Sequence, residues 1–437
     1  MNLAIRGGKK VRTKPFADQL TYGVDETFAV NKFMSQGKLL SNYRGNWIPA
    51  FWGGEEVKAF EDAWSKKFNI DYCLAVNSCT SALQIACGAI GLTYGDEVIV
   101  TPWSMSCSAT APMVWGATPV FADINRETFC LDPASIESKI TSRTKAIIVV
   151  DLFGRPFAKE INAIAEKHGL YIIEDAAQAP GAQRNGMYTG GLGHIGCFSF
   201  TQGKHLTCGE GGMITTGSYP LAMKCALLRN HSESVISAAE DEEKSVREII
   251  GGDDYGYDIV SKPGFNLRMT EINAVIMQKQ LEKLDGYIDN RIRNVADIDN
   301  ALAELDDFIT PAPHLAGEKH SYYVQAFYYN ADKAGITRNT FIDAVKAELT
   351  GEYSRPERPM LGCGYIKPLY RMPIFSGIEM EELPVVEKLW KEDFFLSMYH
   401  NLPLSSVDIV DIKEAFMKVA NYRHELAVSE KQYWRGV

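Results

Sequence analysis

The sequence predicts an α/β fold, in which a mostly parallel sheet carries helices on both of its faces. Apolar runs typical of β-strands alternate with helical patterns between about residues 71 and 217. Strands separated by helices pair in parallel, because each crossover helix returns the chain to the same end of the sheet. An acid and several small hydroxyl residues follow such runs, at the edge where open α/β sheets bind ligands. The chain of 437 residues is too long for one simple core, so we expect two domains.

Seven apolar runs account for the strands of the expected sheet. They alternate with helical patterns such as 158–168, and a further helix is expected at 219–230. The strands are expected at 72–76, 97–101, 118–123, 145–151, 171–174, 195–200 and 211–216.

The second half of the chain predicts a long helix and a smaller domain. From Thr270 to about Leu305, apolar residues recur on one helical stripe, so this helix is expected to link two domains. A strand pattern at 322–329 and helical patterns at 339–348 and 412–419 predict a compact α/β terminal domain. The expected parts are an N-terminal arm and helix (1–50), a large domain (51–285) with an acidic insertion (231–262), and a small C-terminal domain (286–437).

The composition favours a cytoplasmic enzyme. Hydrophobic residues make up 46% and charged residues 23% of the chain, which are ordinary globular values. No apolar run approaches about 18 residues and no leader pattern opens the chain, so we expect no membrane span and no signal peptide. The net charge of -10 argues against a nucleic-acid partner. The nine cysteines and eight histidines show no C-x-x-C pair or metal-ligand spacing, so we expect reduced thiols and no metal site.

Lys204 is the strongest candidate for a catalytic residue. It follows the apolar run that ends at Ser199 and precedes the glycine-rich turn Gly209–Gly212. An amine attacks an aldehyde only when it is unprotonated, which requires low dielectric or nearby positive charge on a rigid element. Small neighbours such as Gly203 allow the close backbone approach that such a site needs. The alternative is a surface lysine in a hairpin, which is the commoner origin of such a segment taken alone.

An acid ends one of the strand runs before Lys204. Glu174-Asp175 follows the apolar run 171–173, which puts a carboxylate at the ligand-binding edge of the sheet. Pyridoxal phosphate (PLP) withdraws electrons only while its ring nitrogen stays protonated, and a buried carboxylate beside that nitrogen keeps it so. Asp175 is the expected partner of the ring nitrogen, and Gln178 that of the phenolic oxygen. The alternative for Asp175 is a helix cap, the commoner role of an acid at a strand end.

Small hydroxyl residues in the segment 77–83 predict an anion site. This segment opens a helix directly after a strand, where free backbone amides and the helix dipole favour a negative group. The 5′-phosphate of PLP would lie on the amides of Cys79 and Thr80, with Ser199 completing the site. An ordinary helix cap explains this segment alone. The three motifs in this order predict a PLP site with Lys204 as its Schiff-base lysine.

The same motifs resemble the DegT/StrS family of sugar aminotransferases. The resemblance includes Ser-Phe-x-x-x-Lys at 199–204, Gly-Glu-Gly-Gly at 209–212 and the segment 264–271. It runs from Leu3 to about Pro403, nearly the whole chain. It implies an aspartate-aminotransferase-like fold of type I, with a mostly parallel seven-stranded sheet in the large domain and a smaller α/β C-terminal domain.

The resemblance also assigns roles to residues. It implies that Lys204 holds PLP as the internal aldimine and moves a proton between the cofactor and the substrate. It implies that Asn266 reaches the phosphate from the neighbouring subunit, so that a homodimer shares its active sites. Without the resemblance, Asn266 fits a plain turn residue equally well.

Two positions depart from the family pattern. Cys79 stands where relatives usually have glycine, although a contact through the backbone amide needs no particular side chain. Family members also tend to place an aromatic ring over the cofactor. Aligned from Gly116, that position falls on Met105, whose thioether packs well against a ring face. Trp103 is the alternative, and either residue also fits a core position.

We expect an aminotransferase that moves an amino group from glutamate or glutamine to a keto sugar attached to a nucleotide. The product would be an amino sugar for lipopolysaccharide or another polysaccharide. A keto-cyclitol (inosose) aminotransferase is the alternative within the same chemistry. A sugar 3-dehydratase of the same family is disfavoured, because such enzymes carry histidine at the position of Lys204, and here His205 is only adjacent. A non-catalytic regulator on the same fold is disfavoured by the intact Lys204, Asp175 and Gln178, and no arginine is assigned to the carboxylate of the donor.

Two other segments bear on the function. Residues 191–196 match the dinucleotide fingerprint G-x-G-x-x-G, but they precede a strand where the fingerprint should follow one and open a helix. A nicotinamide site is therefore disfavoured. The acidic insertion 231–262 lies just before Asn266, and a flap facing the substrate or the other subunit is a hypothesis for it, although most charge runs are solvated surfaces.

Overall fold

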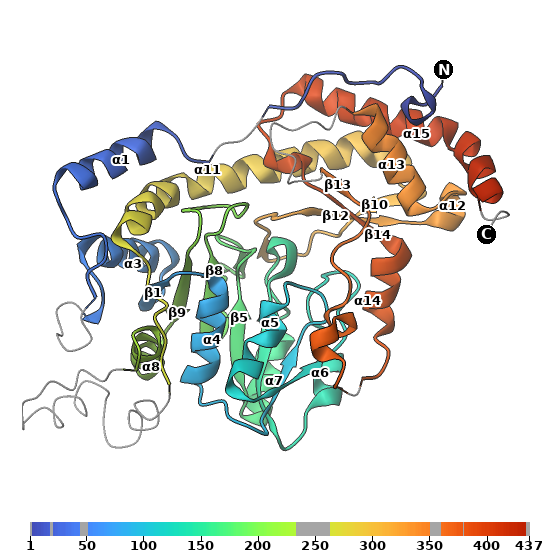
Figure 1. Ribbon diagram of the computed structural model, residues 1–437. Coiled ribbons are helices and arrows are strands. Elements are labelled where there is room, and N and C mark those ends of the chain that lie inside the picture. Colours follow the sequence, from blue (N-terminus) through green and yellow to red (C-terminus); the bar gives the residue numbers. More distant parts are fainter. Residues whose placement is uncertain are drawn as a thin grey trace, which may run out of the picture.

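One large sheet forms the centre of the protein (Figure 1). The computed structural model describes residues 2–17, 21–43, 51–232, 263–349, 360–378 and 380–433. The order of strands in the sheet is β1-β9-β8-β5-β4-β2-β3. All neighbours from β3 to β8 pair in parallel, and β9 is antiparallel to both β8 and β1, so the predicted mostly parallel seven-stranded sheet is confirmed. Its strands are β1 (Tyr72–Val76), β2 (Glu97–Val100), β3 (Thr118–Phe121), β4 (Thr144–Val150), β5 (Tyr171–Asp175), β8 (Ile195–Ser199) and β9 (Gly212–Thr216).

Helices cover both faces of this sheet, as the alternating pattern predicts. Successive side chains of a strand point to opposite faces. In β2, Val98 and Val100 pack with α4 and α8, whereas Ile99 packs with α6 and α7. Burial on both faces explains why the strands appear in the sequence as continuous apolar runs. The covering helices are α3 (Glu55–Phe68), α4 (Cys79–Ala89), α6 (Pro133–Lys139), α7 (Glu160–His168), α8 (Tyr219–Arg229) and α11 (Glu271–Leu302), and α5 (Cys107–Thr110) is a single turn after β2.

A second, smaller α/β unit follows α11. Its antiparallel sheet has the order β10-β12-β14-β13, and α13 and α15 pack against it around Phe341 and Phe416. The predicted strand at 322–329 begins only at Gln325, because the residues before it form a turn in which Tyr322 has φ 51°. The elements are β10 (Ile309–Pro311), β12 (Gln325–Tyr329), β13 (Leu361–Gly362), β14 (Phe394–Ser397), α12 (Ala331–Ala334), α13 (Arg338–Glu348), α14 (Pro384–Lys388) and α15 (Ser406–Tyr433).

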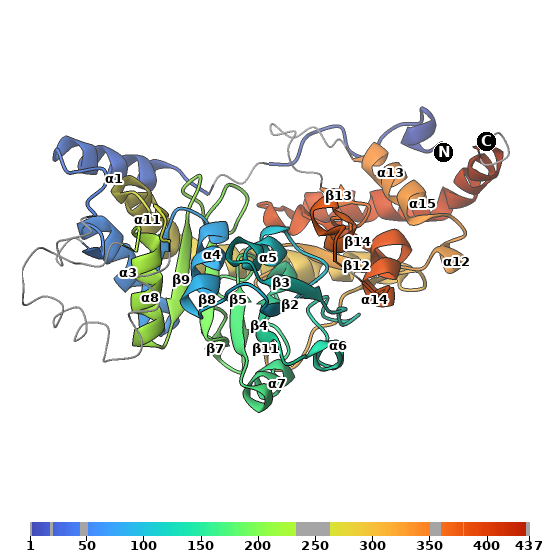
Figure 2. The ribbon, with the colours of Figure 1, turned by 60° about the horizontal axis from the view of Figure 1, so that its bottom comes forward.

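The long helix α11 connects the two sheets. It begins beside α3 and ends beside the smaller sheet, and Figure 2 shows α1 (Val24–Ser35) and α3 at the end of the molecule opposite to α13 and α15. The predicted division after residue 285 falls inside α11, and Leu369 and Val386 pack into the core of the large sheet. The domain boundaries therefore stay a prediction. A third small sheet has the order β11 (Glu318–Lys319), β6 (Gln183–Arg184) and β7 (Met187–Tyr188).

The structure bears on two further expectations, one about the acidic insertion and one about a membrane span. Except for His231 and Ser232, the acidic insertion 231–262 lies outside the described residues, so its role stays a hypothesis. Among the residues that the structure describes, no helix combines the length and the apolar character needed to cross a membrane.

Candidate active site

Several of the predicted site residues lie at one edge of the large sheet. Because β1, β5 and β8 run in the same direction, their carboxyl ends meet at this edge. Asp175 ends β5, Ser199 ends β8, and Cys79 opens α4 shortly after β1. The Cys79 thiol lies 3.8 Å from Oδ1 of Asp175, so the predicted anion turn and the predicted acid are in contact. Lys204 lies close enough for its charge to act on both.

Asp175 is buried and held by short hydrogen bonds. The Ser108 hydroxyl donates to its Oδ2 at 2.7 Å, and the Ala177 amide donates to its Oδ1 at 3.2 Å. Burial raises the pKa of Asp175, while the Ser108 hydrogen bond and the positive charge of Lys204 limit the rise. A buried carboxylate oriented in this way suits a cationic ring nitrogen, whose charge would compensate the cost of burial.

Gln178 has a fixed orientation. Its Oε1 accepts a hydrogen bond from the Phe153 amide at 2.9 Å, and its Nε2 donates to the Tyr365 hydroxyl at 3.3 Å. An amide nitrogen has two hydrogens, so Nε2 keeps one for a further acceptor. This geometry fits the predicted contact with the phenolic oxygen of PLP.

The anion turn depends on a close approach between strands. Ser78 caps α4 by accepting a hydrogen bond from the Ser81 amide at 3.1 Å. The first amides of a helix have no intrahelical acceptor, so those of Cys79 and Thr80 suit a phosphate. In β9, Gly212 pairs with both Val76 and Ser199. A Cβ at Gly212 would lie 2.6 Å from the Ser78 carbonyl carbon, so only glycine lets Ser199 and the turn lie side by side.

Lys204 lies in the turn between β8 and β9. Its amide donates to the Thr201 carbonyl at 3.1 Å, and Gly203 (φ 106°) and Gly209 (φ 89°) take left-handed conformations that favour glycine. Its Nζ lies 4.4 Å from the centre of the Tyr323 ring. The adjacent His205 is fully buried, and its Nε2 bonds the Ser321 carbonyl at 2.9 Å. Burial lowers the pKa of His205 well below its ordinary value, so this ring is neutral and structural.

The structure separates the two candidates for the ring-stacking position. Trp103 is fully buried, and its indole nitrogen donates to the Ile366 carbonyl at 2.6 Å. Its ring packs against Phe153 and Tyr365, which makes it a core residue. Met105 is 55% exposed, just before α5. A stacking role for Met105 stays a prediction.

Asn266 lies on the exposed turn before α11. Its Oδ1 accepts a hydrogen bond from Nε of Arg268 at 2.9 Å, and its backbone pairs with Asn230. Its predicted reach into a neighbouring subunit stays a prediction.

The dinucleotide-like segment serves a different purpose. The amides of Gly190, Leu192 and Gly193 donate to the buried Glu174 carboxylate at 2.6, 2.9 and 2.9 Å. The glycine-rich turn therefore binds a carboxyl group of its own chain, the side chain that precedes Asp175. These hydrogen bonds account for the glycine-rich segment, so no bound nucleotide is needed to explain it.

Four residues of the site escaped the sequence analysis. Ser108, Phe153, Tyr323 and Tyr365 touch Asp175, Gln178 or Lys204, yet the sequence motifs assign none of them to the site. Ser108 is one of several serines after β2, and the two tyrosines come from distant segments. No local signal separates them from other residues of their type.

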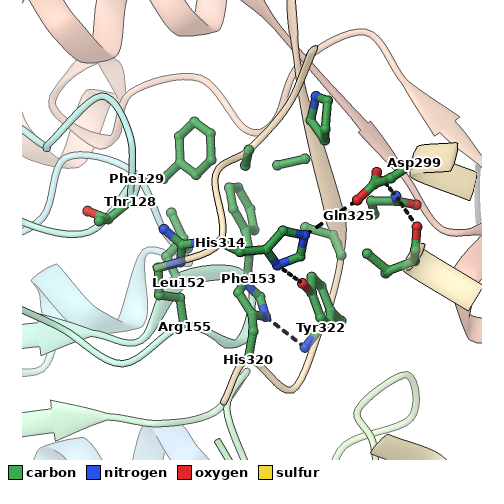
Figure 3. Close-up of a pocket in the computed structure, with 15 residues that line it drawn as sticks. Thr128, Phe129, Leu152, Phe153, Arg155, Asp299, His314, His320, Tyr322 and Gln325 are labelled. Carbon is green, nitrogen blue, oxygen red and sulfur yellow. Dashed lines mark hydrogen bonds and ion pairs between the residues drawn. The ribbon is translucent and has the colours of Figure 1, made fainter. Parts of the chain in front are cut away.

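A hollow lies behind the turn that carries Tyr323. Figure 3 shows His314 between the Tyr322 hydroxyl and Asp299, with His320 beneath. His314 Nδ1 lies 2.9 Å from the Tyr322 hydroxyl, and its Nε2 lies 3.6 Å from the Asp299 carboxylate. A neighbouring cavity of about 250 Å³ is lined by Arg155, His314, Glu318, Lys319, His320 and Tyr322, among others. Tyr322 therefore faces these residues, whereas Tyr323 faces Lys204.

The fold and this site define a PLP-dependent aminotransferase of fold type I. The chain belongs to the DegT/DnrJ/EryC1/StrS aminotransferase family, whose sequence pattern matches residues 36–413. This result confirms the resemblance, the fold type and the cofactor class.

Three proteins illustrate the relationship. GDP-perosamine synthase of Caulobacter vibrioides is 34% identical over 83% of this chain and 90% of its own. L-glutamine:2-deoxy-scyllo-inosose aminotransferase of Streptomyces paromomycinus is 30% identical over 96% of this chain and 98% of its own. The crystal structure of an aminotransferase from Psychrobacter cryohalolentis superimposes with a TM-score of 0.78, at 29% identity, over 94% of this chain and 100% of that one.

Proposed function

We propose that this protein transfers an amino group from glutamate or glutamine to a carbonyl carbon of a keto sugar attached to a nucleotide. The reaction would serve the synthesis of an amino sugar for lipopolysaccharide or another polysaccharide. The single observation that carries the proposal is the meeting of Lys204, the buried Asp175 and the α4 anion turn at one sheet edge. A nucleotide-sugar enzyme among the relatives supports the substrate class.

The residues at this edge fit the functional groups of PLP in their chemistry. Asp175 would bind the ring nitrogen, Gln178 the phenolic oxygen, and Lys204 the aldehyde carbon. The phosphate would lie on the amides of Cys79 and Thr80. Ser199 and Met105 would complete the pocket, and Asn266 would reach the phosphate from the neighbouring subunit of a homodimer.

The chain's own residues would carry out the proton transfers. PLP supplies an electron sink for negative charge at the substrate carbon that bears the nitrogen. Asp175, held by Ser108 and Ala177, would keep the ring nitrogen protonated. Nζ of Lys204 would move a proton between the substrate carbon and C4′ of the cofactor. The sheet edge and α4 would hold these groups in fixed positions relative to one another.

A keto-cyclitol is the second candidate substrate. The inosose aminotransferase aligns with 96% of this chain, whereas GDP-perosamine synthase aligns with 83%. Transfer to a cyclitol uses the same residues and the same chemistry, so the two candidates differ only in the acceptor.

Substrate screening with product analysis tests the proposal. The purified enzyme with PLP is incubated with glutamate or glutamine and with nucleotide-linked keto sugars or an inosose. We expect a 2-oxo acid together with an amino sugar or an aminocyclitol. A deoxy sugar with release of ammonia would show a dehydratase and contradict the proposal. Size-exclusion chromatography with light scattering tests the homodimer.

Borohydride trapping tests the role of Lys204. Reduction of the holoenzyme should attach the cofactor to the peptide that contains Lys204. Lys204→Ala should fold but lose the adduct and lower the turnover at least about a thousandfold. The control is Lys145→Ala, at an exposed position of β4, which should behave as wild type. Normal turnover of the Lys204→Ala variant would contradict the assignment.

A further inference from the structure

The Lys204 amine lies against an aromatic face. Its Nζ is 4.4 Å from the centre of the Tyr323 ring. Among the residues that the structure describes, no ion pair joins this amine to a carboxylate, although its charge acts on the buried Asp175 carboxylate. Ammonium groups are attracted to the negative face of an aromatic ring, most strongly where water is excluded. A ring attracts the cation without being able to take its proton.

The position of Tyr323 is fixed by an unusual backbone contact. The Tyr323 amide donates to the Phe153 carbonyl at 2.7 Å, and the Ser321 amide donates to the Gly154 carbonyl at 2.9 Å. Gly154 permits this approach, because a Cβ there would lie 2.8 Å from the Tyr322 nitrogen. Two aromatic residues at the contact, Phe153 (φ 63°) and Tyr322 (φ 51°), have left-handed backbones. Such conformations are unfavourable for bulky residues and gather at functional sites.

The same peptide segment also holds Gln178. The Phe153 amide donates to Oε1 of Gln178 at 2.9 Å, while the Phe153 carbonyl accepts from Tyr323. One residue in a left-handed conformation therefore orients the side chain expected at the phenolic oxygen and the ring beneath the lysine. The neighbouring Tyr322 faces the other way, toward His314 and His320 (Figure 3).

We propose that Tyr323 is a positioning residue that receives the Lys204 ammonium whenever this amine is free. The inference rests on the proposed role of Lys204, which must leave and rejoin the cofactor in every turnover. A free lysine side chain has many rotamers, and a ring that attracts its charge confines it near the reacting carbon. A carboxylate in the place of the ring would bind the ammonium through charge-assisted hydrogen bonds and oppose its loss of a proton.

Chemical labelling of the apoenzyme tests this inference without the cofactor. Acetic anhydride modifies only the unprotonated amine. Mass spectrometry measures the ratio of Lys204 modification near pH 7 to that near pH 10. This ratio reports how strongly the protein favours the ammonium form of Lys204. A change in the access of the reagent affects both values equally, so it cancels in the ratio. We expect Tyr323→Leu to raise this ratio about threefold or more, because the attraction of the ring is lost. Tyr323→Phe retains the ring face and should stay within about twofold of wild type.

The matched control is Tyr322→Leu, which truncates the neighbouring ring on the other side of the turn and should leave the ratio unchanged. If Tyr323→Leu does not fold, Tyr323→Met replaces it. An unchanged ratio in the folded truncation, or an equal rise in Tyr322→Leu or Tyr323→Phe, would overturn the inference. Borohydride trapping of PLP on wild-type Lys204 separates the two failures. If PLP is trapped on Lys204 but the labelling ratio is unchanged in the Tyr323 variant, only the role of Tyr323 is refuted. If PLP is not trapped, the proposed function itself is refuted.

Discussion

The Ser108 hydroxyl donates a 2.7 Å hydrogen bond to the Asp175 carboxylate, and both side chains are buried. Ser108 lies in α5 and Asp175 at the end of β5, so the contact joins two segments that are distant in sequence. The hydrogen bond favours the ionised carboxylate against the effect of burial, which raises its pKa. In the role that we propose for Asp175, Ser108 would help to keep this carboxylate ionised beside the ring nitrogen.

Ser108→Ala is expected to lower the turnover about tenfold or more, since a hydrogen bond to a charged group is lost. Without this bond the pKa of Asp175 rises further, so the carboxylate takes up a proton at a higher pH. The acid limb of the pH profile of kcat/KM should move to higher pH. Steady-state kinetics between about pH 5 and pH 9 measure both effects. The control is Ser138→Ala, which removes an exposed hydroxyl that donates to the Ser135 carbonyl. An acid limb that does not move in Ser108→Ala would contradict the role of Ser108.

Gly212→Ala is expected to weaken PLP binding and to destabilise the fold by about 1–3 kcal/mol. The added Cβ would lie 2.6 Å from the Ser78 carbonyl carbon, so the anion turn must move away from Ser199. Thermal unfolding with and without PLP measures both consequences. Gly217→Ala is the matched control just after the same strand, because its Cβ meets nothing within 4 Å. Equal stability and equal PLP binding of the two variants would show that the close approach of Gly212 to Ser78 has no importance.

Arg229→Met is expected to destabilise the protein by about 3–5 kcal/mol, because it leaves a buried acid without its partner. The guanidinium is fully buried and donates to Glu61 Oε1 and to the Ala75 carbonyl, each at 2.9 Å. The double variant Glu61→Gln/Arg229→Met removes both charges and should lose less than the single variant. Urea unfolding of the single and double variants measures the coupling. An equal or greater loss of stability in the double variant would show that the loss of the Glu61–Arg229 pair does not cause the destabilisation.

Glu387→Gln is expected to destabilise the protein by about 2 kcal/mol at pH 7. Burial alone would raise the pKa of Glu387, but hydrogen bonds from Arg371, Tyr370 and Lys391 outweigh it and bring the pKa to about 2, below the ordinary 4.5. A lowered folded-state pKa means that this stabilisation is complete above about pH 4.5 and is lost as the pH falls toward 2.

Urea unfolding of wild type and Glu387→Gln between pH 7 and pH 3 tests this dependence. The difference between the two proteins should shrink as the pH falls. Glu381→Gln, which removes an exposed ion pair with Lys139, should leave the unfolding midpoint unchanged at every pH. A constant difference for Glu387→Gln would mean that the charge of Glu387 does not contribute.

The sequence by itself determined the large sheet and the main groups at its edge. Strand runs such as 72–76 and 171–174 could be predicted because strands buried on both faces are continuous apolar runs bounded by helical patterns. Asp175, Lys204 and the segment 77–83 could be found because each lies at or shortly after the end of such a run, and the carboxyl ends of parallel strands share one edge. The predicted strand at 322–329 began too early, because a hydrophobic pattern does not reveal a left-handed turn at Tyr322.

Only the tertiary structure decided which side chains complete the site. Ser108 reaches Asp175, Tyr323 lies under Lys204, and the Phe153 peptide joins Gln178 to Tyr323. The burial of Trp103 in the core, which removes it as the alternative to Met105, also became visible only in the tertiary structure. The physical reason is that local periodicity specifies strands and their ends, whereas contacts between distant segments depend on how the elements pack, and packing is not encoded in any short stretch of sequence.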